Sequence, residues 1–346
     1  MKISPTFSGL LRAGKYFMFA ALAACTMTAC SSDDDDDEGG SGAGNFTTPK
    51  YEDCAAKYVV NDDNSDYQSI ELTASGNYII SYNETDNGPV AAPKAGTAKT
   101  VKIAGHEVKL PGMLTKAGMS DFATTRIYSE IAYGTYTKTG DDSYTLNGFG
   151  TVTVTRDAQG HPTSLTITRN GGTPEAVHVT QQNADLNSAM SNSLCRTWRI
   201  TGYRTIQKIN GETFMDLTDD TFIGLMKKME DWAKKNDPEY APSDWDYSEI
   251  EEDETFVEQV IFTKSGTYMV LYEGNRLAIS TWKWENEKTG LLRYSWNPDN
   301  FYDEDESGEV TVFFQNNKLF LGSKETDNEN GYKYEFGVYN VLSEVK

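Results

Sequence analysis

The chain has 346 residues, with 52 acidic and 31 basic side chains and a formal net charge of −21 at pH 7. This balance excludes nucleic acid as a partner, because phosphate binding needs a positively charged surface. About 300 residues follow the first 44, which is enough for two domains of ordinary size.

The N-terminus has the order typical of a secretory signal peptide. Lys2, Arg12 and Lys15 precede an apolar segment over 16–24 that is too short to cross a bilayer as a helix. Small residues precede both Cys25 and Cys30, so either cysteine could be the acylated first residue of a mature lipoprotein. We predict a signal peptide over 1–29 and lipid attachment at Cys30, with Cys25 as the alternative.

Residues 30–44 predict a tether between the lipid and the folded part. An acidic run over 33–38 follows Cys30, and a Gly/Ser-rich stretch over 39–44 comes next. Like charges repel and cannot be buried, so this segment stays extended whether or not it has another role.

The cysteine with its acidic run resembles the export signal of surface lipoproteins in the Bacteroidetes. The resemblance implies anchoring in the outer membrane through N-terminal acyl chains such as palmitate. It also implies that the folded part is exposed at the cell surface, where an envelope protein is a further expected partner.

Two cysteines remain after processing, Cys54 and Cys195. In an oxidising exterior they could form one disulfide. The alternative is that they are two small buried residues at equivalent places in two modules.

A repeat runs through the chain. Residues 69–82 align without a gap with residues 259–272, and both predict a strand, a Ser-Gly turn and a second strand. Three more matches follow in the same order: 131–138 with 277–284, 150–154 with 308–312, and 164–167 with 318–321. The shared order indicates internal duplication.

Each copy predicts a meander of short antiparallel strands, which hides its edges most completely by closing into a barrel. We therefore predict an all-β fold with two tandem antiparallel β-meander barrels, over 45–183 and 184–346. An amphipathic helix is inserted in the second copy, where apolar residues recur at helical spacing between Phe222 and Ala233 and Pro238 ends the pattern.

The second copy opens with Leu194 to Tyr203, in which Thr197-Trp198 starts an alternating strand. This resembles the first strand of the lipocalin-like lipoproteins of Bacteroidetes, which carry Gly-Thr-Trp there; Arg196 stands in place of the glycine. The resemblance implies a calycin-type barrel with a cavity for a small ligand. It also implies that Trp198 closes one end of the barrel, with Arg199 beside it.

No catalytic constellation emerges. The three histidines, His106, His161 and His178, are isolated, and the folded region has neither a nucleophile elbow nor a zinc-binding spacing. We predict a protein that is not an enzyme and has no cofactor.

Four aromatic residues are the candidate ligand contacts. Trp282 and Trp284 alternate on one strand, and Tyr294 and Trp296 alternate on the next, so a hairpin would place Trp282 opposite Tyr294. These rings either fill the barrel or line a cavity for a sugar or lipid. We expect non-catalytic binding of a small apolar or saccharide ligand; the alternative is an envelope scaffold whose barrels are filled.

One acidic loop has a partial calcium pattern. Asp303, Asp305 and Ser307 alternate before Gly308, as at the start of a calcium loop, but the twelfth position is Phe314 instead of a bidentate Glu. The alternative is a charged hairpin tip without a metal.

Overall fold

The computed structural model describes the chain over 43–83, 100–103, 106–109, 131–182, 186–236, 257–272, 276–295, 297, 300–302, 307–329 and 331–345. The predicted all-β class is confirmed, because strands dominate this part of the chain and its α-helices are α3 (Ala189–Leu194) and α4 (Phe222–Asn236). Neither helix is long and apolar enough to span a membrane.

The first copy forms a closed barrel of eight antiparallel strands in the order β1-β10-β9-β8-β7-β6-β3-β2. A single 3-10 turn, η1 (Glu52–Cys54), precedes its first strand. The strands are β1 (Ala56–Val60), β2 (Tyr67–Leu72), β3 (Asn77–Tyr82), β6 (Ile131–Gly140), β7 (Ser143–Leu146), β8 (Gly150–Arg156), β9 (Pro162–Arg169) and β10 (Glu175–Gln182). The insertion between β3 and β6 contains a separate hairpin of β4 (Thr100–Ile103) and β5 (His106–Lys109).

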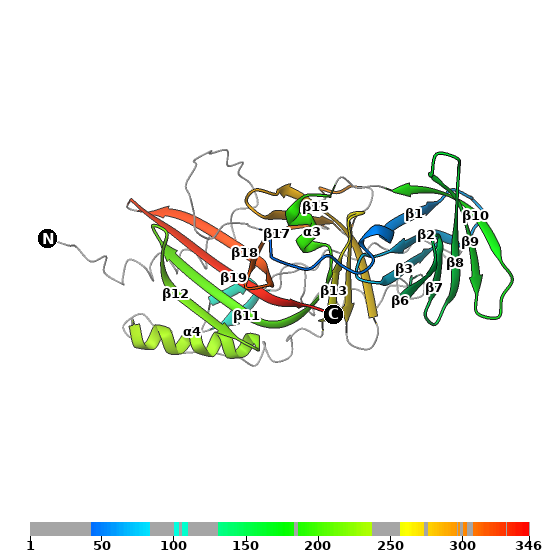
Figure 1. Ribbon diagram of the computed structural model, residues 1–346. Coiled ribbons are helices and arrows are strands. Elements are labelled where there is room, and N and C mark those ends of the chain that lie inside the picture. Colours follow the sequence, from blue (N-terminus) through cyan, green and yellow to red (C-terminus); the bar gives the residue numbers. More distant parts are fainter. Residues whose placement is uncertain are drawn as a thin grey trace.

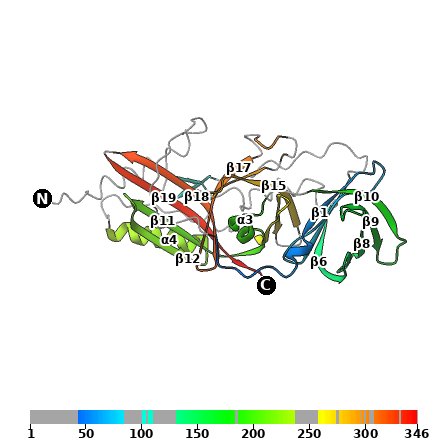
Figure 2. The same ribbon diagram turned by 45° about the horizontal axis from the view of Figure 1, so that its top comes forward.

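The second copy forms a nine-stranded sheet in the order β12-β11-β13-β14-β15-β16-β17-β18-β19, in which β11 also pairs with β19. Its strands are β11 (Thr197–Ile209), β12 (Glu212–Asp219), β13 (Val257–Phe262), β14 (Thr267–Tyr272), β15 (Arg276–Asn286), β16 (Leu291–Ser295), β17 (Ser307–Gln315), β18 (Lys318–Glu329) and β19 (Tyr332–Glu344). We call this unit the second sheet and the two units together the modules. They lie side by side (Figures 1 and 2), and β13 and β3, labelled in Figure 1, both contribute to the contact between them.

The predicted amphipathic helix is confirmed as α4, which runs along β11 and β12 (Figure 1). Thr221 caps it, since the hydroxyl of Thr221 accepts a hydrogen bond from the Gly224 amide at 3.0 Å. Phe222 packs edge-on against Tyr203 of β11, with ring centroids 5.5 Å apart. The helix therefore buries its apolar face against β11 and β12.

The two Ser-Gly turns lie in matching surroundings. Gly76 and Gly266 have φ angles of 87° and 82°, in the left-handed region that glycine adopts without strain. Tyr136 donates its hydroxyl to the Thr73 carbonyl at 3.0 Å, and Trp282 donates its indole N–H to the Thr263 carbonyl at 3.1 Å. The repeated hairpin is thus held by the same type of contact in both modules.

The strand registers make the correspondence between modules residue by residue. Tyr58 pairs with Ile70 as Trp198 pairs with Val260, so Tyr58 stands where the second copy has Trp198. The sequence match of 164–167 with 318–321, which equates Ile167 with Leu321, is wrong by two residues. Leu165 pairs with Val154 as Leu321 pairs with Val312, so Leu165 corresponds to Leu321. A slip of two residues keeps every side chain on the same face, which is why the apolar pattern could not detect it.

The modules meet through equivalent surfaces. The apolar contact combines outer-face residues of both copies, Ile79, Ile131 and Tyr133 from the first and Ile261, Met269, Leu271, Leu277 and Ile279 from the second. Around it, Lys57 donates to the Thr267 hydroxyl at 3.3 Å, while Thr197 donates to the Asn77 side-chain oxygen at 3.0 Å. The registers equate Lys57 with Thr197, and the aligned hairpins equate Asn77 with Thr267, so these two bonds are related as in a two-fold dimer.

Of the two alternatives for Cys54 and Cys195, the structure shows two separate buried residues and no disulfide between them. Cys54 and Cys195 are both free thiols and both buried, each in the core of its own module. The two cysteines lie at similar places, each close to the helical turn that precedes the first strand of its module. Cys54 is the last residue of η1, and Cys195 directly follows α3. Each sulfur atom is thus buried in a different core.

Candidate functional site

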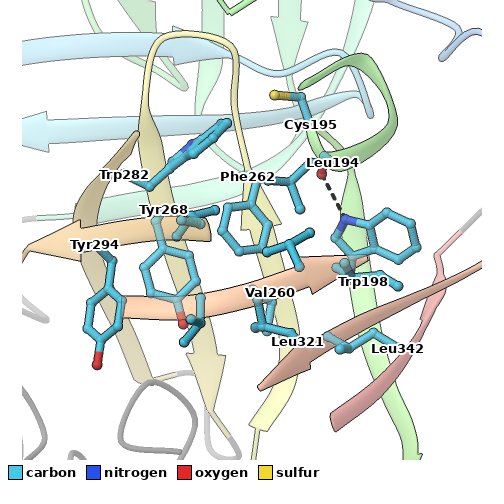
Figure 3. Close-up of a cluster of buried hydrophobic side chains, with 14 of the residues drawn as sticks. Leu194, Cys195, Trp198, Val260, Phe262, Tyr268, Trp282, Tyr294, Leu321 and Leu342 are labelled. Carbon is cyan, nitrogen blue, oxygen red and sulfur yellow. Dashed lines mark hydrogen bonds between the residues drawn. The ribbon is translucent and has the colours of Figure 1, made fainter. Parts of the chain in front are cut away.

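The predicted aromatic contacts lie in the core of the second sheet. Trp282 pairs directly with Tyr294, as expected, but their side chains are only 2% and 5% exposed (Figure 3). Trp284 is half-buried and donates its indole N–H to the Ser191 hydroxyl at 2.9 Å. Trp296 lies outside the described residues. Trp282 and Tyr294 are therefore core residues that the surface of the second sheet does not expose.

One end of the second sheet, which we call the α3 end, is closed by aromatic rings. Trp198 is fully buried there and donates its indole N–H to the Leu194 carbonyl at 2.8 Å (Figure 3). Phe46, from the segment before η1, packs edge-on against Trp198 at 5.4 Å and against Phe314 at 5.5 Å between ring centroids. Arg199 is exposed, and the buried arginine at this end is Arg196.

The corresponding end of the first barrel, the η1 end, holds an open polar pocket of about 220 Å³. The residues lining the pocket come from η1, from β1, from the β6–β7 hairpin and from the ends of β8 and β10: Asp53, Cys54, Ala55, Ala56, Tyr58, Lys138, Asp141, Asp142, Tyr144, Arg156 and Gln181. A volume below the usual range for drug-sized ligands indicates a small ligand.

Opposite charges alternate around this pocket. Arg156 donates from Nε to Oδ1 of Asp142 at 2.8 Å and from Nη1 to the Gly160 carbonyl at 3.0 Å. Lys138 Nζ lies 3.8 Å from Oδ2 of Asp53. The pocket thus offers cationic donors and carboxylate acceptors at fixed positions around its rim.

Three groups that line the pocket, the hydroxyls of Tyr58 and Tyr144 and the thiol of Cys54, stay protonated at neutral pH. Burial raises the pKa of the Tyr58 and Tyr144 hydroxyls, and at Tyr58 the neighbouring Arg156 opposes that shift. Burial, with a hydrogen bond to Asp53, also raises the pKa of the Cys54 thiol. A protonated thiol is a poor nucleophile, so this arrangement suits binding better than covalent chemistry.

The polar pocket and the aromatic closure occupy equivalent places. The registers equate Tyr58 with Trp198 and Tyr144 with Leu292. On β8 and β17, Arg156 corresponds to Phe314, because each lies two residues after Val154 and Val312, which have equivalent partners in the register. Sequence analysis missed the pocket because its residues come from four separate stretches of the chain. The signal available was the polar residues that the first copy has at places where the second copy has aromatic ones.

The calcium pattern gains no support from the part of the chain that the structure describes. Ser307 begins β17 and accepts a hydrogen bond from Arg293 Nη1 at 3.4 Å, while Asp303 and Asp305 lie outside the described residues. No group of three or more His, Cys, Asp or Glu side chains within the described ranges could hold a metal ion.

No protein-family model, curated protein or solved structure matches this chain.

Proposed function

We propose that this chain is a lipid-anchored, surface-exposed, non-catalytic binding protein whose ligand is a small polyhydroxylated molecule of the saccharide class. The observation that carries the proposal is the open polar pocket at the η1 end of the first barrel. Sugar hydroxyls both donate and accept hydrogen bonds, which fits a rim of carboxylates and cations with phenol hydroxyls below.

The proposal includes a lipocalin-like architecture for both copies. The pairing of β11 with β19 joins the first and last strands of the second meander, in the same way as β1 pairs with β10 in the first barrel. On this basis the second sheet is a second barrel of the same eight-strand design, with β12 added outside. Its filled interior then makes it a structural partner of the ligand-binding barrel.

The anchor in the proposal is Cys30, with Cys25 as the alternative, and the location is the outer membrane. Metabolic labelling of cells with palmitate should mark the wild-type protein and the Cys25→Ser variant. It should leave the Cys30→Ser variant unmarked. Labelling that persists in the Cys30→Ser variant and disappears only in the Cys25→Ser variant would move the anchor, and no labelling at all would remove it.

The ligand proposal is tested by a screen of monosaccharides and polyols against a lipid-free Cys30→Ser chain. All six tryptophans lie at or beyond position 198, so tryptophan emission cannot report on this pocket, and ligand-observed NMR is the suitable readout. We expect saturation transfer to at least one sugar, lost in Arg156→Ala and kept in Arg199→Ala, an exposed arginine of the other module.

The second candidate function is an envelope scaffold that uses its outer faces. It is favoured by the filled core of the second sheet, where Trp282 and Tyr294 are inaccessible. If no sugar or polyol gives saturation transfer, or if Arg156→Ala binds as the wild type does, the saccharide proposal fails and the scaffold function takes its place.

A further inference from the structure

The α3 end of the second sheet holds a short piece of the chain that belongs to neither meander. Residues 43–49 have no regular secondary structure, and Phe46 from this segment is half-buried among the rings of the second sheet. Trp198 and Phe314 both meet Phe46 edge to face, with interplanar angles of 84° and 74°. Edge-to-face contacts of this kind are among the favoured arrangements of aromatic pairs.

Arg196 and Ser193 hold the backbone on either side of this ring. Arg196 donates from Nη1 to the Thr47 carbonyl at 2.9 Å, and Ser193 donates its hydroxyl to the Gly44 carbonyl at 3.3 Å. The guanidinium of Arg196 also lies 4.8 Å from the centre of the Phe46 ring, within range of a cation–π contact. One aromatic anchor with donors to the flanking carbonyls is an arrangement that recognises an extended peptide.

Arg196 has hydrogen-bonding capacity that the bound segment does not use. Its side chain is 3% exposed and pairs with Glu344 at 2.6 Å, yet within the described chain its Nε has no hydrogen-bond partner. A buried unsatisfied donor is costly, so a buried arginine aimed at a peptide and only partly satisfied points to a binding role.

We infer that the α3 end is a binding site for an extended peptide with an aromatic side chain, occupied in cis by residues 44–47. The segment acts as an intramolecular ligand, and a partner peptide of the same chemistry competes with it. Because it is tethered, the cis segment has an effective concentration in the millimolar range, so weak external peptides are excluded. The predicted tether over 30–44 ends where this segment begins, so the segment is the first part of the folded chain after the proposed lipid anchor.

The test uses a labelled peptide of residues 43–50, Ala-Gly-Asn-Phe-Thr-Thr-Pro-Lys, added to the lipid-free Cys30→Ser chain. We expect the Phe46→Ala chain to bind this peptide at least about tenfold more tightly than the unaltered chain does, because the cis competitor has lost its anchor. The matched control is Thr47→Ala, which keeps the carbonyl that Arg196 binds and should exclude the peptide as the wild type does. A peptide whose Phe is replaced by Ala should not bind any chain.

Equal binding of the peptide to the Phe46→Ala and unaltered chains, with circular dichroism showing both folded, would overturn the inference. A second measurement needs no variant and covers the case in which Phe46→Ala does not fold. Brief treatment of the native chain with chymotrypsin should cut after Phe46 before it cuts at any strand aromatic, because a bound segment opens locally. Cleavage after Phe46 that appears only together with strand cleavage would show that the segment is core and not a ligand.

Discussion

The η1 end of the first barrel and the α3 end of the second sheet are the same place in two copies of one meander, and they have diverged in opposite directions. Where the second copy has Trp198 and Phe314, the first has Tyr58 and Arg156. The aromatic end is closed by a ring from outside the meander, while the polar end stays open. A duplicated scaffold can thus diverge at one equivalent place, so that one copy keeps this end open and polar while the other closes it with aromatic rings.

The largest effect is expected from removing a core ring at this end of the second sheet. Trp282→Ala should lower the free energy of unfolding by about 3–5 kcal/mol, because it leaves a cavity in a filled interior. Chemical denaturation followed by circular dichroism measures this loss. Trp284→Ala, at a half-buried site, serves as the control with a smaller loss. A Trp282→Ala chain as stable as the wild type would mean that this ring lines a cavity instead of filling the core.

The contact between modules should make the two copies unfold together. Met269 is fully buried in this contact, so Met269→Asp places a charge without a partner among apolar side chains and should cost about 3 kcal/mol. We expect calorimetry to show one transition for the wild type and two for Met269→Asp. Tyr133→Phe keeps the ring but removes a hydroxyl that donates to Gln259 at 3.2 Å and accepts from the Asn77 amide at 2.9 Å; without a buried charge it should keep a single transition. Two transitions in the wild type would show that the modules are independent.

Alkaline pH should destabilise both modules through their buried tyrosines. Burial raises the pKa of the interior tyrosines of the first barrel, Tyr58, Tyr67, Tyr78, Tyr82, Tyr136 and Tyr144, and in the second sheet it raises the pKa of Tyr294 and of Tyr339, each of these two to about 12. Phenols of the unfolded chain ionise at about pH 10, so above that pH each buried phenol with a raised pKa favours unfolding.

The stability from these neutral phenols is therefore complete below about pH 10 and is lost as the pH rises through the folded-state values. Tyrosinate absorbance together with the amide signals of each module follows this change. Unchanged stability of both modules as the pH rises above about 10 would contradict the expectation.

The smallest effect compares the two repeated turns. Gly76→Ala and Gly266→Ala should each cost about 1–2 kcal/mol, because both glycines have left-handed φ angles that alanine adopts only with strain. A Cβ would come within 3.0 Å of the Tyr51 ring at Gly76 and within 3.2 Å of the Trp282 carbonyl oxygen at Gly266, so the two costs should be similar. Denaturation of the two variants side by side measures the difference. A negligible cost at one turn alone would mean that the two hairpins are not equivalent.

Sequence reasoning found the repeated hairpin, the helix α4 and the pairing of Trp282 with Tyr294, because each depends on local periodicity or on short-range turn chemistry. It could not distinguish a filled interior from a hollow one. The alternation of residues along a strand predicts which face of the sheet a ring lies on, but not which side chains of other strands pack against that ring. The polar pocket and the binding site of Phe46 are each formed by segments far apart in the chain, and a periodic pattern along the sequence cannot predict such contacts.

The reactivity of the two free thiols tests most directly the claim that one end is open and the other closed. Cys54 lines the pocket and Cys195 belongs to the closed core, while burial raises the pKa of both thiols. A chain with Cys25→Ser and Cys30→Ser, treated natively with a small methanethiosulfonate at mildly alkaline pH, should be labelled at Cys54 and stay unlabelled at Cys195 until it unfolds. Equal labelling of both, or labelling of Cys195 first, would contradict the account.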